Sequence, residues 1–165
     1  MRPDLPDDLN SVFEPESSLN FNWRPWFVQR IHPTLLGYWA VRWHYSGHGG
    51  PTPKAYGAFA PSLAVVAGLA QSSSKDGLSN RLGLTGFTGN LELSRVVAHP
   101  LAPANSVSMA LGQFMAMWRS EGLEWVFSYA DQGQNHHGGV YQAINAVYIG
   151  STPARTGFML DGKLI

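Results

Sequence analysis

The chain has 165 residues, of which 44% are apolar and 13% are charged, and it contains no cysteine. This composition predicts a single globular domain with a sizeable core and excludes an intrinsically disordered protein, a disulfide framework and thiolate metal sites. No run of about 18 apolar residues is present, so no transmembrane helix is expected.

The charges are unevenly distributed although the net charge is zero. The first 20 residues contain one arginine and five acidic residues, whereas residues 21–165 contain ten basic and six acidic residues. We predict an acidic, flexible tail over residues 1–20 and a mildly basic catalytic domain over residues 21–165. A mildly basic surface permits a polyanionic partner without requiring one. The acidic, proline-containing start is unlike a signal peptide.

The first half of the chain predicts one strand, one helix and a hairpin. Residues 26–32 are a plausible first strand, and Pro33 is well placed to open a helix that runs to about Tyr45. A glycine-rich loop follows over residues 46–53. The segments "AYGAF" and "LAVVAGLA" predict a hairpin around Pro61-Ser62, and the glycine- and serine-rich residues 72–89 give no clear pattern.

The second half predicts alternating strands and helices. Residues 90–98 read as a strong strand, and Asn105 is expected to cap a helix that ends near Gly122. The spacing of the apolar residues predicts which side of that helix faces the core. The residues on this side are Leu111, Phe114, Met115 and Trp118. A strand over residues 124–130, a helix over residues 138–148 and a terminal hairpin around Asp161-Gly162 complete the order. We expect Val140, Ile144 and Val147 to share the buried face of that helix.

This order predicts a single α/β domain. The adjoining middle strands require hairpins, and the strand–helix–strand segment requires a parallel crossover, so a mixed central sheet with flanking helices fits better than a doubly wound parallel sheet.

The predicted strand–loop–helix over residues 90–122 offers an anion site. Asn105, Ser106 and Ser108 lie in the first helical turn, where free backbone N–H groups attract a phosphate or another anion. Ordinary helix capping explains the same residues equally well. Neither a Walker motif nor a G-x-G-x-x-G motif is present.

Charged and aromatic residues near strand ends are the candidate catalytic groups. Arg95 lies inside a strand, where it is either an edge residue or requires a carboxylate or a bound anion. Asp131 follows the next strand, so it could neighbour Arg95, in a pair that is either functional or structural. Tyr141, on the following helix, could orient a substrate or pack into the core.

The histidines suggest two different chemistries. His44 suits general acid/base catalysis, because its pKa lies near working pH. His44, His48, His136 and His137 could alternatively contribute to a two-histidine-one-carboxylate iron site with Asp131, but their spacing does not identify metal ligands. The sequence does not choose between His136 and His137.

The element order is similar to that of the GNAT acyltransferases, although "LAPANSVS" stands where the acyl-CoA loop Q/R-x-x-G-x-G/A is usual. A narrower set of motifs resembles the phage Mom DNA-modification proteins over residues 28–150. They are "RWHYSG", "LELSRVV", "ANSVSMALG", "SYAD" and "GGVYQAINAVYIG". The set of five is specific, whereas any one alone would be weak. Mom proteins usually continue for some tens of residues beyond the position of Ile165, so we expect a shortened or short member.

The Mom resemblance implies a GNAT-like transferase that converts adenine in DNA to N6-carbamoylmethyl adenine and protects phage DNA from restriction. It implies a location in the cytoplasm of the host cell. His44 and Tyr45 would line the catalytic cleft, Arg95 and Ser108 would hold the donor or the adenine, and Asp131 and Tyr141 would complete the site. The donor is an acyl-CoA or another activated molecule, and iron has been associated with the family.

Two other functions remain open at the level of sequence. A GNAT-like N-acyltransferase would use acyl-CoA to modify a small amine or a protein, but the missing acyl-CoA loop argues against it. A non-catalytic phage module would leave the Arg, Asp, Tyr and His residues at strand ends unexplained.

Overall fold

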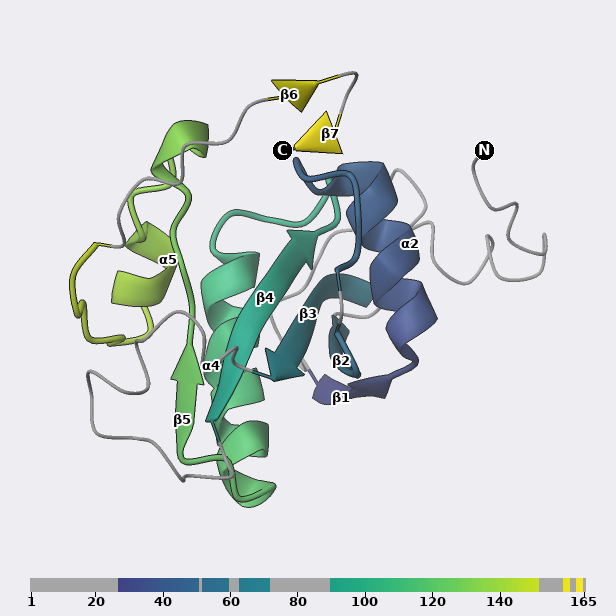
Figure 1. Ribbon diagram of the computed structural model, residues 1–165. Helices are drawn as coiled ribbons and strands as arrows, with labels where there is room; N and C mark the ends of the chain where they lie inside the picture. The colour runs from purple at the N-terminus through teal and green to yellow at the C-terminus, as the bar shows by residue number, and fades with distance from the viewer. Residues whose placement is uncertain are drawn as a thin grey trace, which may run out of the picture.

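The computed structural model describes residues 27–50, 52–59, 63–71, 90–151, 159–160 and 163–164. The predicted N-terminal tail and the segment over residues 72–89 lie outside these ranges. The described residues form a mixed sheet with helices on both of its faces, which confirms the predicted mixed α/β class (Figure 1). The likeness to the GNAT acyltransferase fold stays a prediction.

The five strands of the central sheet lie in chain order. They are β1 (Phe27–Ile31), β2 (Lys54–Phe59), β3 (Leu63–Gln71), β4 (Asn90–Ala98) and β5 (Trp125–Phe127). The pairs β1–β2, β2–β3 and β3–β4 are antiparallel, and β4–β5 is parallel. The predicted hairpin and the predicted parallel crossover are therefore both confirmed.

Two helices cover opposite faces of this sheet (Figure 1). Helix α2 (Pro33–Trp43) buries Leu36, Trp39 and Ala40 against one face. Helix α4 (Ser106–Ser120) buries Leu111, Phe114 and Trp118 against the other. Fully burying one large apolar side chain contributes roughly 1.5–3 kcal/mol, so these two stripes hold the helices on the sheet.

Two expectations for the helices are wrong in detail, and the predicted cap of α4 is confirmed in position only. Met115, placed in the core stripe of α4, is exposed, because Phe114 and Trp118 already define the buried side. Asn105 occupies the cap position of α4 but has a left-handed backbone (φ 67°), and its side chain makes no capping hydrogen bond. The helix predicted over residues 138–148 is only α5 (Gly139–Gln142), and Val147 is 83% exposed.

The remaining elements are short. A 3-10 turn, η2 (Gln132–Gln134), follows β5, and strands β6 (Met159–Leu160) and β7 (Lys163–Leu164) pair antiparallel on either side of the predicted Asp-Gly turn. After α5 the backbone N–H groups of Ile144 and Asn145 bond three residues back, and Asn145 has φ 59°, a left-handed conformation that cannot extend the helix to residue 148. Within the described part of the chain, no helix is long and apolar enough to cross a membrane.

An irregularity in β4 decides which way Arg95 faces. Gly68 pairs with Arg95 whereas Leu69 pairs with Leu93, so β4 carries one extra residue between these pairs. Side chains alternate along a strand, so Leu93 and Arg95 would otherwise share a face. After the bulge, odd-numbered Val97 packs in the cluster on the α2 side, whereas Leu93 packs on the α4 side. The bulge therefore turns Arg95 towards α2 and the loop that follows it.

Candidate active site

Side chains from four separate segments meet beside β4. His44 and Tyr45 follow α2, Arg95 lies on β4, Asp131 follows β5, and Tyr141 lies on α5. The Asp131 charge raises the pKa of Tyr45 and the Arg95 charge lowers it. Tyr141 also raises the pKa of Tyr45. All five residues that the sequence nominated as catalytic therefore lie in one neighbourhood.

Tyr45 and Asp131 form the centre of this cluster. The Tyr45 hydroxyl lies near the Asp131 carboxylate, and partial burial together with that carboxylate raises the pKa of Tyr45. The phenol therefore keeps its proton at neutral pH. The Asp131 carboxylate also accepts the backbone N–H of Gly133 at 3.0 Å, a contact that starts η2 and fixes the orientation of the carboxylate.

The protonation state of His44 follows from its contacts. The backbone N–H of Ser46 donates to Nδ1 of His44 at 3.2 Å, and Oγ of Ser46 lies 2.8 Å from the same nitrogen. A backbone N–H can only donate, so Nδ1 accepts and neutral His44 carries its proton on Nε2. Burial, followed by the charges of Arg95, His136 and His48, lowers the pKa of His44. His44 therefore presents a neutral Nε2–H group.

We expect the pKa of His44 to lie below 6.5, the ordinary histidine value. As pH falls, the unfolded chain binds this proton first, so the protein loses stability below about pH 6.5, the unfolded-state value. Titration of the histidine ring signals by NMR, with His44→Gln for assignment, would measure the midpoint. Arg95→Gln should move the midpoint upwards, and an unchanged midpoint would separate Arg95 from His44.

Arg95 is held by neutral acceptors. Its Nε–H donates to the carbonyl oxygen of His48 at 3.1 Å, Nη2 lies 3.1 Å from Nδ1 of His48, and Nη1 donates to the Ser94 carbonyl. Arg95 and Asp131 do not form an ion pair within 4 Å. Among the described residues, an ion pair within that distance is formed by Arg30 and Glu121 instead. The Arg95–Asp131 pairing considered from the sequence is therefore absent, and the Arg95 charge is available to a ligand.

Sequence reasoning missed two serines that orient the candidate groups. Ser46 contacts His44 as described above and lies 3.2 Å from the His48 carbonyl. Ser128 follows β5, and its hydroxyl lies 2.7 Å from the Tyr141 hydroxyl and 3.2 Å from the Leu93 carbonyl. The motifs "HYS" and "SYAD" contained both serines, but only the fold shows that they support the neighbouring histidine and tyrosine.

The structure distinguishes the two adjacent histidines. The His136 ring meets the Tyr45 ring edge-on with the centroids 5.4 Å apart, and His136 contributes to lowering the pKa of His44. His137 accepts a hydrogen bond from Nε2 of Gln142 through its backbone carbonyl at 3.5 Å. His136 is therefore the histidine of this pair that lies at the site.

The polar residues predicted to bind a donor lie at the start of α4. Ser106 is buried, and its hydroxyl donates to the Pro103 carbonyl at 2.6 Å. The hydroxyl of Ser108 donates to the carbonyl of Asn105 at 3.0 Å. Asn105 itself is exposed. Ser106 therefore supports the loop before α4, whereas Ser108 and Asn105 stay accessible.

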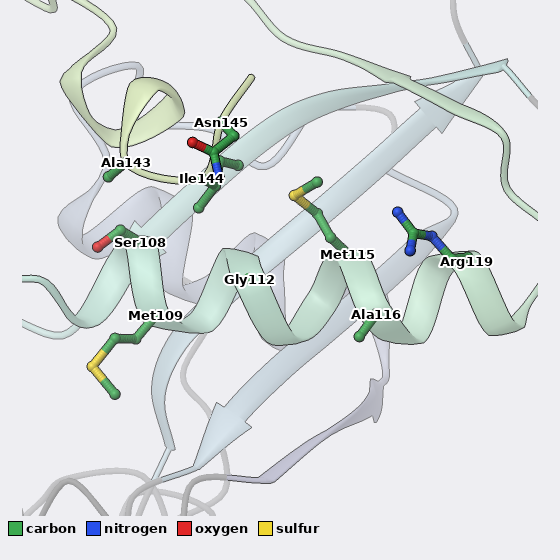
Figure 2. A pocket seen from close by; sticks show the side chains of 9 residues that line it. All are labelled: Ser108, Met109, Gly112, Met115, Ala116, Arg119, Ala143, Ile144 and Asn145. Atoms are coloured by element: carbon green, nitrogen blue, oxygen red, sulfur yellow. The ribbon is translucent and has the colours of Figure 1, made fainter. Parts of the chain in front are cut away.

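Ser108 also lines a groove between α4 and the segment that follows α5. Figure 2 shows the lining side chains along the outer side of α4, with Ser108 and Asn145 near one end and Arg119 at the other. The groove has a volume of about 390 Å³. Its wall is mostly small or apolar, with Gly112, Met115 and Ile144 among its members.

The described residues do not fit an iron centre. Among them, no group of three His, Asp or Glu side chains comes together in a way that could hold a metal ion. His44 uses Nδ1 towards Ser46, and Nδ1 of His48 faces Arg95. Iron stays a prediction from the resemblance.

Comparisons with known proteins identify the family. Residues 25–164 match the model of the Mom protein family. The chain is similar to the methylcarbamoylase Mom of Escherichia phage Mu, with 39% identity over 77 residues. That stretch is 46% of this chain and 32% of the phage Mu protein, so the chain matches less than two thirds of that relative. Since the family model spans most of the chain, this protein belongs to the Mom family.

Proposed function

We propose that this protein transfers a carbamoylmethyl group to the N6 amine of adenine in DNA. Support comes from the family match and from the name of the phage Mu relative, a methylcarbamoylase. The carrying observation is the meeting of Tyr45, Asp131 and His44 beside Arg95, which forms no ion pair within 4 Å with any residue that the structure describes. Such a cluster can remove a proton and stabilise developing negative charge in one place.

The exposure of the cluster suits a macromolecular substrate. Tyr45 is 53% exposed, and Asp131 and His136 are exposed as well. The N6 amine of adenine is paired within the duplex, so the base must leave the stack or be presented in single-stranded DNA. An open site accepts a displaced base that is still attached to its strand, which a deeply enclosed pocket would not do.

Asp131 is the proposed base. The lone pair of adenine N6 is conjugated with the ring, so the amine is a weak nucleophile and must lose a proton as it attacks. Asp131 is acceptor-only when ionised, and its contacts with Gly133 and Tyr45 hold it in one orientation. The neutral Nε2–H of His44 can only donate, so we assign His44 to a hydrogen bond with the donor rather than to proton removal.

Arg95 and His44 are the proposed stabilisers of the donor. The transferred group ends in a carboxamide, whose carbonyl oxygen accepts hydrogen bonds from a guanidinium and an imidazole N–H. Tyr141, held by Ser128, completes this side of the site. Acyl transfer from an acyl-CoA would give an N6-acyl group, so direct transfer of a carbamoylmethyl group requires another activated donor. The N6–CH2 bond forms as the bond from CH2 to the carrier breaks, and the carrier leaves with the bonding electrons. In the donor complex this carrier would extend past Asn105, Ser106 and Ser108 towards the groove along α4.

The test is mass spectrometry of nucleosides from plasmid DNA in cells that express this chain. We expect a deoxyadenosine heavier by one C2H3NO unit, absent from cells that carry the empty vector. Unmodified DNA with folded, soluble protein in the same cells would contradict the proposal. Binding of acetyl-CoA together with acylation of an amine would then identify the N-acyltransferase alternative.

A further inference from the structure

We infer that His48 is a positioning residue that holds the guanidinium of Arg95 so that one pair of its N–H groups faces the substrate. This inference rests on the proposed function for its catalytic consequence, whereas the contact itself is independent of that function. His48 belongs to the glycine-rich loop after α2 and is not among the residues that the motifs nominated as catalytic.

The first step is the protonation state of His48. Nη2 of Arg95 lies 3.1 Å from Nδ1 of His48. A guanidinium has donors but no acceptor, so Nδ1 of His48 must accept and the ring proton of neutral His48 lies on Nε2. His48 therefore offers Arg95 two acceptors, its ring nitrogen and its carbonyl oxygen, to which Nε–H donates at 3.1 Å.

The second step is a count of the remaining donors. A guanidinium carries five N–H groups. His48 takes the pair formed by Nε and Nη2, and the Ser94 carbonyl takes one N–H of Nη1. One N–H on Nη1 and one on Nη2 remain for a ligand. Such a pair matches a carboxylate, a phosphate or a carbonyl oxygen.

The third step is the rigidity of the loop that carries His48. A Cβ on Gly49 would lie 2.8 Å from the Cα of Gly37 in α2, so this backbone approach requires glycine. Gly50 has φ 66°, and a Cβ there would lie 3.1 Å from Nη2 of Arg95. The two glycines let the loop fit between α2 and the guanidinium, which fixes His48 against Arg95.

These contacts give His48 a specific role. The bulge in β4 turns Arg95 towards the loop, and His48 then sets the rotation of the guanidinium plane. The charge of Arg95 lowers the pKa of both His44 and Tyr45. A rotated guanidinium would therefore alter the side of the site that binds the donor. Small misplacements of a positioned group cost as much as roughly a hundredfold in rate.

The test compares two substitutions of similar size. His48→Asn keeps an acceptor oxygen near the position of Nδ1, whereas His48→Leu has the same branched shape without an acceptor. We expect His48→Leu to lower the rate of adenine modification roughly tenfold or more, and His48→Asn to stay within a few-fold of the wild type. Equal rates for His48→Leu and the wild type, or equal losses in both variants, would overturn the inference.

A second measurement does not depend on activity. Nitrogen-15 NMR of the imidazole groups reports which ring nitrogen carries the proton. We expect His48 to be the Nε2–H tautomer in the wild type and to redistribute its proton in Arg95→Gln. If the wild-type protein leaves DNA unmodified but shows this response, the proposed function fails while the contact stands. If His48 carries its proton on Nδ1, the inference fails whatever the activity.

Discussion

Replacing Arg95 with alanine is expected to lower adenine modification by roughly a hundredfold to a thousandfold, as for removal of a donor that stabilises transition-state charge. The guanidinium faces neutral acceptors from His48 and Ser94, so its charge remains available to the donor. The measurement is the rate of appearance of modified deoxyadenosine per unit of folded protein.

Arg95→Lys tests the geometry of the same group. Lysine keeps the positive charge but lacks the planar fork, so it should not restore the rate. Arg42→Ala removes an arginine from the exposed side of α2 and is the matched control. Thermal melts of all three variants would show whether stability accounts for a loss. Full activity in a folded Arg95→Ala variant would remove Arg95 from the mechanism.

Replacing Asp131 with asparagine is expected to lower adenine modification by roughly a hundredfold to ten-thousandfold, the usual contribution of a general base. The amide oxygen of asparagine can still accept the backbone N–H of Gly133, so η2 should keep its start. The amide cannot take a proton from the attacking amine at neutral pH. Nucleoside mass spectrometry over a time course measures the loss.

Two further variants separate proton transfer from simple charge removal. Glu124→Gln makes the same acid-to-amide change at an exposed residue just before β5, and it should retain the wild-type rate. Tyr45→Phe removes the hydroxyl near Asp131 but leaves the carboxylate in place. It should therefore cost less than Asp131→Asn. A larger loss in Tyr45→Phe would make the tyrosine, rather than the aspartate, the group closest to the reaction.

The sheet explains why the site can be both open and well ordered. β5 pairs with β4 from Asn90 to Glu92, and Ser128 then bonds to the Leu93 carbonyl as the chain leaves the sheet. The following segment carries Asp131 and His136 outwards to meet Tyr45. At the opposite edge of the sheet, Arg30 of β1 and Tyr56 of β2 both donate hydrogen bonds to the carboxylate of Glu121, which follows α4. The catalytic segments are therefore exposed, while their anchors lie in a packed framework.

Local sequence patterns determined the order of the elements and the residue types of the site. Apolar periodicity predicted both large helices and the strands, because these patterns depend on neighbours within a few positions. The histidine, tyrosine, arginine and aspartate residues could be nominated because they stand at the ends of such elements or break an apolar strand. The motifs also indicated the family, which the comparison over residues 25–164 confirmed.

Tertiary structure alone decided how these residues meet. A one-residue bulge reverses the face of every later side chain, so Arg95 meets His48 rather than Asp131. Contacts across the fold also selected His136 rather than His137, because its ring lies against Tyr45. The left-handed Asn145 prevents the helix from extending to Val147, which is exposed. Each of these outcomes depends on residues distant in sequence or on one backbone angle, and neither is encoded in periodicity.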